Sequence, residues 1–401
     1  MKVLISGTAS AAGWPAPGCG CASCARVPRG RSRTSVRLDA PGVPPGGPVP
    51  HLPPGDPGPC LTPDRPVPHV TPVPRVGPVP RVPSGVTVPH GDLPSSGFVV
   101  LPPSGGSLPP GYQARSGPDG LTVTTPDGLR ILYAAALPAL PFPYATTGPA
   151  EEPDMVLVDV LDRPERLGDL RRRGLVGERT HVVAVDVDHR VPTEAELARR
   201  TALWGVRTVP DGTVIDLRDP PPTPPLLPRR TLLLGGSRSG KSAEAELRLA
   251  AEPDVLYVAT GPSGEGDPEW SRRVRAHRDR RPAHWGTAET TDLAGVLRSA
   301  TSPLLIDGLG TWITAVFDEC GAWSGGEGLD AVAARCDELV AAWRQTRVRV
   351  VAVSDEVGLG VVPHTSSGRM FRDALGRLNQ RLSMESEDVG LVVAGRLLGP
   401  I

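Results

Sequence analysis

The sequence predicts an α/β protein with an irregular, proline-rich N-terminal half and a C-terminal domain built on a parallel β-sheet. Three observations support this prediction. From Arg230 onward, short apolar runs alternate with helical segments, which is typical of a parallel sheet covered by helices on both faces. A glycine-rich motif at 235–242 stands between the first such run and the first helix. Proline (49 residues) and glycine (47) approach a quarter of the 401 positions, which requires irregular stretches.

The N-terminal half begins with a short strand at 3–6 and a loop rich in glycine and cysteine. A proline-rich stretch with short proline-valine echoes follows from Pro41. We expect residues 41–115 to be irregular, because proline supplies no backbone N–H. Order is expected to return near Gly120 with a β-hairpin at 121–135. Two buried strands are expected at 155–161 and 181–187, with an arginine-rich helix between them, and an amphipathic helix is expected at 193–205.

A second proline-rich segment, 219–229, marks the domain boundary and separates region 1–218 from domain 230–401. In the C-terminal domain we expect strands at 231–234, 254–260, 303–308, 348–354 and 388–395. The helices between them are expected at 242–252, 268–280, 329–345 and 371–386.

Charge and hydropathy exclude several classes of protein. Lys and Arg (43) balance Asp and Glu (44), whereas proteins that bind nucleic acid or anionic membranes usually need a basic face. No apolar run reaches about 18 residues, so no membrane span is expected. The N-terminus lacks the apolar core of a signal peptide, which favours a cytoplasmic location. Among the cationic residues only Lys2 and Lys241 are lysine.

Lys241 lies in a motif that fits G-x-x-x-x-G-K-[ST] at every fixed position. Its members are Gly235, Gly236, Ser237, Arg238, Ser239, Gly240, Lys241 and Ser242. Backbone N–H groups of such a loop face phosphate oxygens, the lysine reaches the β- and γ-phosphates, and the serine hydroxyl holds Mg²⁺. Asp307, which ends an apolar run, is the candidate metal-facing carboxylate; the alternative is a turn aspartate that caps the next helix. The motif predicts an NTPase or kinase without naming a substrate.

Three histidines and three cysteines are further candidates. His277 follows Arg273 by one helical turn and is either a surface residue or a nucleophile for phosphorus; His284 is the other nearby candidate, and His364 is expected in a turn. Cys19, Cys21 and Cys24 fall within six positions, which in a reducing compartment suggests a metal clip. The alternative is a loop of reduced cysteines without metal.

Residues 230–401 closely resemble the bifunctional adenosylcobinamide kinase / adenosylcobinamide-phosphate guanylyltransferases of cobalamin biosynthesis. The matching segments run in order along the domain: GGSRSGKS (235–242), VLYVAT (255–260), D-x-E-x-x-x-R-V-x-x-H (267–277), RRPAHWGTAE (280–289), LLIDGLGTWIT (304–314), SDEVGLGVVP (354–363) and GRMFRDALGRLNQRL (368–382). The family often has Asn where this chain has Ala315 and sometimes a second histidine where it has Ala276.

This resemblance implies a RecA-like P-loop sheet, ATP or GTP as phosphoryl donor, Mg²⁺ held by Ser242 and Asp307, and Lys241 and His277 as catalytic residues. It implies that His277 attacks GTP and passes GMP to adenosylcobinamide phosphate, giving adenosylcobinamide-GDP. The family forms homotrimers, which implies a homo-oligomer. The further nucleotide-binding positions that it implies are Val258, Ala259, Thr260, Arg281, Pro282, Ala283, His284, Glu289 and Asp307.

The opening segment 6–27 resembles the start of metallo-β-lactamase-fold phosphodiesterases, some of which hold a structural zinc on C-x-C-x-x-C and a distant histidine. This implies zinc on Cys19, Cys21 and Cys24, with His189 as one candidate for the fourth ligand. The catalytic H-x-H-x-D-H motif is absent, and His51, His69 and His90 are isolated, so we expect a truncated domain without hydrolytic activity.

Two other functions compatible with the same motifs are a P-loop kinase of another small molecule and a nucleotide-binding regulator. The first would phosphorylate without His277, and the second would bind nucleotide without turnover. A regulator has no need for His277, which favours the transferase.

Overall fold

The computed structural model describes residues 1–39, 98–101, 110–134, 151–161, 163–261, 272, 275, 278–279 and 281–398. No helix in these ranges is long and apolar enough to span a membrane.

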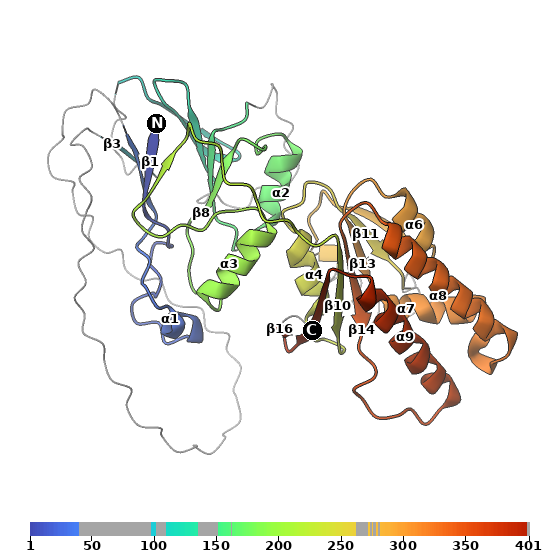
Figure 1. Cartoon of the computed structure of the whole chain (residues 1–401). Helices are drawn as coiled ribbons and strands as arrows, with labels where there is room; N and C mark the ends of the chain where they lie inside the picture. The colour runs from blue at the N-terminus through green and yellow to red at the C-terminus, as the bar shows by residue number, and fades with distance from the viewer. Residues whose placement is uncertain are drawn as a thin grey trace, which may run out of the picture.

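Two β-sheets form the described part of the N-terminal region (Figure 1). The first has the order β3-β2-β1-β9 and is antiparallel, with β1 Lys2–Gly7, β2 Ser35–Asp39, β3 Phe98–Leu101 and β9 Thr213–Asp216. The second runs β4-β5-β6-β7-β8, with β4 Gln113–Gly117, β5 Gly120–Thr124, β6 Arg130–Tyr133, β7 Met155–Val158 and β8 His181–Ala184. The last three of these strands are parallel neighbours.

The two sheets share one apolar core. Ile5 and Leu38 from the first sheet pack with Ile131 and Leu157 from the second, all fully buried. The other face of the second sheet is covered by α1 Ala22–Arg26, α2 Glu165–Arg172 and α3 Glu194–Leu203. The region is therefore a two-sheet sandwich with helices on one outer face.

The C-terminal sheet has the order β12-β11-β13-β14-β10-β15-β16, and only β16 is antiparallel to its neighbour. The strands are β10 Arg230–Gly235, β11 Leu256–Ala259, β12 Gly286–Glu289, β13 Leu304–Asp307, β14 Val350–Asp355, β15 Asp388–Val393 and β16 Arg396–Leu398. Because the side chains of the central strands are buried on both faces, these strands are apolar runs rather than alternating ones.

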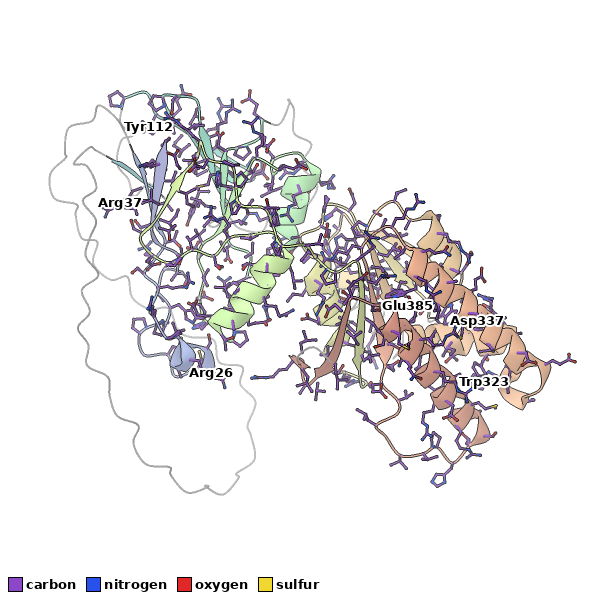
Figure 2. The ribbon with its side chains drawn as sticks, viewed as in Figure 1. Arg26, Arg37, Tyr112, Trp323, Asp337 and Glu385 are labelled. Carbon is purple, nitrogen blue, oxygen red and sulfur yellow. The ribbon has the colours of Figure 1, made fainter. Side chains whose placement is uncertain are left out.

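Helices cover both faces of this sheet. One face packs against α6 Leu293–Ser299, α7 Leu309–Glu319, α8 Glu327–Gln345 and α9 Ser366–Met384. The other packs against α4 Lys241–Leu249. Asp337 on α8 and Glu385 at the end of α9 lie on the outer side (Figure 2), where each pairs with an arginine of the opposite helix, Arg381 at 2.7 Å and Arg344 at 2.5 Å.

The N-terminal region packs on α4, the helix that follows the glycine-rich loop (Figure 1). Arg199 on α3 binds both carboxylate oxygens of Glu244, at 2.8 and 3.0 Å. The indole of Trp204 donates to the backbone oxygen of Leu247 at 2.7 Å, and Arg171 donates to that of Ala251 at 2.8 Å. The outer face of α4 is therefore covered by the chain's own N-terminal region.

Some elements differ from the sequence-based expectation. Two strands lie within the range 41–115, which was expected to be irregular. Phe98–Leu101 pairs with β2, and β4, which starts at Gln113, pairs with β5, so backbone hydrogen bonds order both segments. Helices α6 and α7 and strands β12 and β16 were not expected. Most of the helix expected at 268–280 lies outside the described residues, as does most of 41–115.

Candidate functional site

The P-loop leaves β10 at Gly235 and enters α4 at Lys241. Gly240 has φ +96°, and Arg238 adopts φ +58°. A Cβ on Gly235 would lie 2.5 Å from the Ser239 hydroxyl and 2.6 Å from the Val392 oxygen, so glycine is required there. The Ser239 hydroxyl is buried without a hydrogen-bond partner in the described part of the chain, as a donor for a phosphate oxygen would be.

Lys241 points back over this loop. Its ammonium donates to the Gly236 oxygen at 3.1 Å and pairs with Asp355 Oδ1 at 2.8 Å. The lysine side chain is only 9% exposed, so the charge needs a partner. Asp355 ends β14, which lies between the P-loop strand and β13, and sequence reasoning did not select it.

Asp307 at the end of β13 faces the start of α4. Ser242 Oγ donates to Asp307 Oδ1 at 3.0 Å, which brings together the two residues predicted to hold Mg²⁺. The phenol of Tyr257 donates to Asp307 Oδ2 at 2.5 Å. Burial and the charge of Asp307 raise the pKa of Tyr257, so the phenol keeps its proton. Sequence reasoning missed this tyrosine because it lies in an apolar strand segment, and only the pairing of β11 with β13 brings its hydroxyl to Asp307.

Several other predicted positions meet at the carboxyl edge of the sheet. The parallel register aligns Ala259 of β11 with Asp307 on one side and with Glu289 of β12 on the other. Thr260 Oγ1 donates to the Gly308 oxygen at 2.6 Å. The register therefore places Ala259, Thr260, Glu289 and Asp307 along the edge where ligands of open α/β sheets bind.

His277 and Arg273 lie outside the described residues. The residue after the histidine, Arg278, has its guanidinium 3.8 Å from Glu289 Oε1. The chain then reaches Arg281, whose guanidinium carbon lies 3.4 Å from the centroid of the Tyr257 ring. Of these two neighbours, Arg278 contacts Glu289 at the carboxyl end of β12, and Arg281 contacts Tyr257 within β11.

His284 occupies a different place from the other predicted nucleotide-binding residues. It precedes β12, at the amino end of the parallel strands, where Trp285 and Gly286 bond to backbone oxygens of Pro282 and Val255. Burial lowers the pKa of His284, and the backbone of Glu252 bonds to it there. His284 therefore lies at the edge of the sheet opposite the P-loop, together with Pro282 and Ala283. His364 is an exposed residue whose backbone oxygen accepts from Arg369.

Cys19, Cys21, Cys24 and His189 form a second cluster, in the N-terminal region. One ligand atom from each lies within 4.8 Å of all the others. His189 Nδ1 is 3.6 Å from Cys19 Sγ and 3.7 Å from Cys24 Sγ. The backbone N–H of Cys24 lowers the pKa of Cys21, while burial raises the pKa of Cys24 to about 11. This donor set can hold a metal ion, and the candidate fourth ligand is where it was expected.

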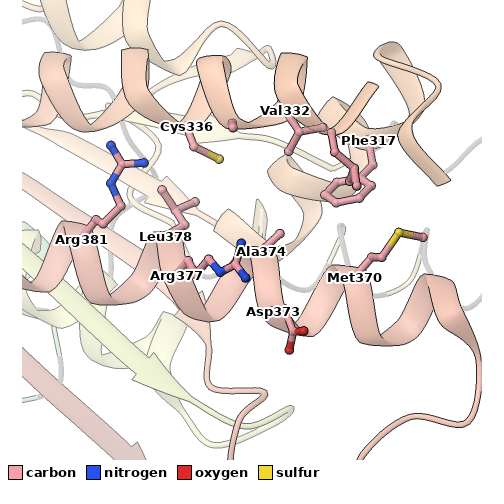
Figure 3. A pocket seen from close by; sticks show the side chains of 11 residues that line it. Phe317, Val332, Cys336, Met370, Asp373, Ala374, Arg377, Leu378 and Arg381 are labelled. Atoms are coloured by element: carbon pink, nitrogen blue, oxygen red, sulfur yellow. The ribbon is translucent and has the colours of Figure 1, made fainter. Parts of the chain in front are cut away.

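Two pockets lie away from the P-loop. A groove of 290 Å³ runs between α7, α8 and α9, with Phe317, Val332 and Leu378 among its apolar walls and Arg377 and Arg381 beside them (Figure 3). A pocket of 310 Å³ in the N-terminal region has Tyr133, Asp159, Asp186 and Arg190 on its walls. None of the residues that line this pocket is a histidine, so it lacks the imidazoles of an H-x-H-x-D-H dinuclear site.

Comparison with known proteins identifies the C-terminal domain. Residues 231–399 match the family described as cobinamide kinase / cobinamide phosphate guanyltransferase. The bifunctional adenosylcobalamin biosynthesis protein CobU of Salmonella typhimurium is 40% identical over 179 residues, which cover 41% of this chain and 95% of the relative. The CobU protein of Escherichia coli is 36% identical over 174 residues, with coverage of 41% and 95%.

A solved type III secretion ATPase is also similar, at 13% identity and a TM-score of 0.28, over 41% of this chain and 50% of that one. That similarity is too low to support an argument. The family is assigned from the two CobU relatives, because the match covers 95% of the length of each. Through residues 231–399 this chain belongs to the cobinamide kinase / cobinamide phosphate guanyltransferase family and is a bifunctional kinase and nucleotidyltransferase of adenosylcobalamin biosynthesis.

Proposed function

We propose that domain 230–401 performs both steps at the carboxyl edge of its sheet, with adenosylcobinamide as the first acceptor and ATP or GTP as the phosphoryl donor. The observation that carries this proposal is the approach of Ser242 to Asp307, 3.0 Å apart, beside the P-loop lysine. One strand, β14, lies between β13, which ends at Asp307, and β10, which leads into the P-loop, and on this order we infer a RecA-like arrangement.

In the kinase step, the hydroxyl oxygen of the aminopropanol arm attacks the γ-phosphorus, and the hydroxyl proton is released to solvent. The bond between γ-phosphorus and the bridging oxygen breaks, and the nucleoside diphosphate leaves. Lys241 leaves Asp355 for the β- and γ-phosphates, where its charge stabilises the leaving group. The N–H groups of residues 236–242, at the N-terminus of α4, bind the phosphate oxygens.

In the nucleotidyl step, an imidazole nitrogen of His277 attacks the α-phosphorus of GTP. A P–N bond forms, and the bond to the bridging oxygen breaks to release pyrophosphate. A phosphate oxygen of adenosylcobinamide phosphate then attacks the same phosphorus, and the P–N bond breaks to free His277. The 3.8 Å separation of Arg278 and Glu289 supports placing this chemistry at the carboxyl ends of β11 and β12.

The donors at the P-loop fit Mg²⁺. The Ser242 hydroxyl gives its one proton to Asp307, which leaves an oxygen lone pair for the cation, and hard oxygen ligands are what Mg²⁺ prefers. When bound, Mg²⁺ neutralises charge on the phosphate oxygens. Ser242 and Asp307 would hold it.

For the N-terminal region we infer a structural zinc on Cys19, Cys21, Cys24 and His189, since three thiolates and an imidazole are a favourable zinc donor set. The two-sheet sandwich supports a relationship to metallo-β-lactamase folds. We expect no hydrolysis there, and cleavage of a phosphodiester by the full chain with Zn²⁺ or Mn²⁺ would contradict this. The inferred homo-oligomer is tested by light scattering.

The test of the proposed mechanism is incubation with Mg²⁺ and GTP labelled in the α-phosphate, followed by denaturing electrophoresis. We expect a covalent label that is acid-labile and alkali-stable, as phosphoramidates are, and its loss in His277→Ala. His364→Ala is the matched control, because His364 is exposed and lies outside the segment 267–277 that carries His277. A label that survives in His277→Ala would refute the assignment.

A further inference from the structure

Tyr257 is a buried phenol that the mechanism above does not use. It lies in β11, is 3% exposed and packs with Leu305 and Val351 on the face of the sheet that α4 covers. A tyrosine in such a core is usually replaceable by phenylalanine unless its hydroxyl has a partner. Here the hydroxyl has one, the carboxylate of Asp307.

Asp307 is held by two donors on different oxygens. Ser242 donates to Oδ1 at 3.0 Å and Tyr257 to Oδ2 at 2.5 Å. Each hydroxyl has a single proton, so both donors are committed to this carboxylate. Two such bonds fix the rotation of the carboxylate plane, and residues that orient a metal ligand in this way govern metal affinity.

The ring of Tyr257 makes a second contact. The guanidinium carbon of Arg281 lies 3.4 Å from the ring centroid, a cation–π geometry. Arg281 also donates to Thr287 Oγ1 at 3.4 Å, which ties it to the start of β12. Arg281 follows the proposed nucleophile by four residues. Tyr257 therefore contacts the metal-facing carboxylate through its oxygen and the segment after His277 through its ring.

We propose that Tyr257 is a positioning residue for both reactions: its phenol sets the orientation of Asp307, and its ring holds the Arg281 segment beside the same site. This inference rests on the proposed function, because it assigns Asp307 to the cation. It predicts that the oxygen and the ring of one side chain have separable effects.

The variants Tyr257→Phe and Tyr257→Leu separate them. Tyr257→Phe keeps the ring, so we expect the Mg²⁺ concentration for half-maximal rate to rise roughly 10-fold or more in both the kinase and the GTP self-labelling assays. At saturating Mg²⁺ both rates should return to within about 3-fold of the parent, because the chemistry itself is intact. Tyr257→Leu should add a loss of roughly 10-fold in labelling rate that Mg²⁺ does not restore.

Tyr133→Phe is the matched control. Tyr133 is also buried, at 5% exposure, and donates to an aspartate, Asp186, at 3.3 Å, but in the N-terminal sandwich. Removing this oxygen should leave the Mg²⁺ dependence of both reactions unchanged. If Tyr257→Phe behaves like Tyr133→Phe, the phenol only fills the core and the proposal is overturned.

Calorimetric titration of ATP at several Mg²⁺ concentrations separates this proposal from the proposed function. It needs no corrinoid and no turnover. Were the parent chain to bind Mg²⁺–ATP without transferring phosphate or GMP, the proposed function would fail, and Tyr257→Phe would still be expected to weaken the Mg²⁺-dependent part of binding. An unchanged titration curve would contradict the role of Tyr257 in either case.

Discussion

Lys241 and Asp355 form an ion pair at the P-loop, with the lysine side chain 9% exposed and the aspartate 37% exposed. Removing water from an ammonium group is costly, and the ion pair with Asp355 offsets that cost here. In the mechanism that we propose, nucleotide phosphates compete with Asp355 for this ammonium group. The ammonium group is therefore buried but can change its ionic partner, as it would have to do when it stabilises charge on the phosphates during phosphoryl transfer.

Replacing Lys241 with alanine removes this charge from the β- and γ-phosphates. We expect the rate of adenosylcobinamide phosphorylation to fall at least about 100-fold, since phosphoryl transfer is catalysed mainly by positioning and by electrostatic stabilisation of the transition state. Lys2→Ala is the control, because Lys2 is the other lysine of the chain and lies exposed on β1. The measurement is labelled phosphate transfer from ATP. Equal rates in the two variants would exclude the P-loop as the kinase site.

The residues at the site differ in how well the sequence predicts them. Lys241 and Ser242 were selected because the P-loop is a local motif, and the structure places the Ser242 hydroxyl 3.0 Å from Asp307, the other residue expected to hold Mg²⁺. Asp355 was missed because its importance depends on strand order: only the placement of β14 between β10 and β13 brings it to Lys241. Tyr257 was missed for the same reason, since it reaches Asp307 from a neighbouring strand.

At the scale of elements, alternation of apolar runs and helical segments predicted most of the C-terminal domain, and the strands at β10, β11, β13, β14 and β15 were confirmed. Helix α7 was missed because its sequence, Leu309–Glu319, is rich in β-branched and aromatic residues, whose helix propensity is low. Its burial against α8 and α9 outweighs that preference. Strand β12 was missed because Gly286–Glu289 has no apolar pattern, and only pairing with β11 defines it.

The contact between α3 and α4 makes the N-terminal region part of the support of the P-loop helix. Arg199 there is 29% and Glu244 12% exposed, and Arg199 also bonds Glu196 at 2.8 Å. Arg199→Ala removes one of two arginine partners from each glutamate, since Glu196 also pairs with Arg200 and Glu244 with Arg248. We expect a loss of about 1–2 kcal/mol in the free energy of unfolding. Denaturant unfolding measures it.

Arg298→Ala is the control for that variant. The Arg298–Glu338 pair has the same 2.8 Å separation, but its side chains are 48% and 44% exposed. Solvent screens such a pair, so we expect a change below about 0.5 kcal/mol. If Arg199→Ala were no more destabilising than Arg298→Ala, the pairing of α3 with α4 through Arg199 would not contribute to the free energy of unfolding.

At the scale of the whole molecule, the chain joins a transferase domain to a sandwich that carries its own cysteine–histidine cluster. Local composition predicted the boundary at 219–229, where no regular element occurs between β9 and β10. The pairing of two sheets around one core was not predicted, because β1, β2 and β9 are far apart in the sequence. The position of His189 beside the cysteines likewise depends on this long-range packing.

The purified full chain should contain one zinc ion per molecule, measured by mass spectrometry of the metal. Cys21→Ser should lose it and unfold at a lower temperature, since metal binding contributes to folding. Cys320→Ser, which changes a partly exposed free cysteine of the other domain, should keep the zinc. A metal content that does not depend on Cys21 would contradict the assignment.

Product analysis of His277→Asn tests whether one domain performs both steps and whether only the second step requires His277. The full chain is incubated with adenosylcobinamide, ATP, GTP and Mg²⁺, and the corrinoids are separated by chromatography. The parent chain should produce adenosylcobinamide-GDP, whereas His277→Asn should stop at adenosylcobinamide phosphate. Formation of the GDP product by His277→Asn at the parent rate would show that guanylyl transfer does not need His277.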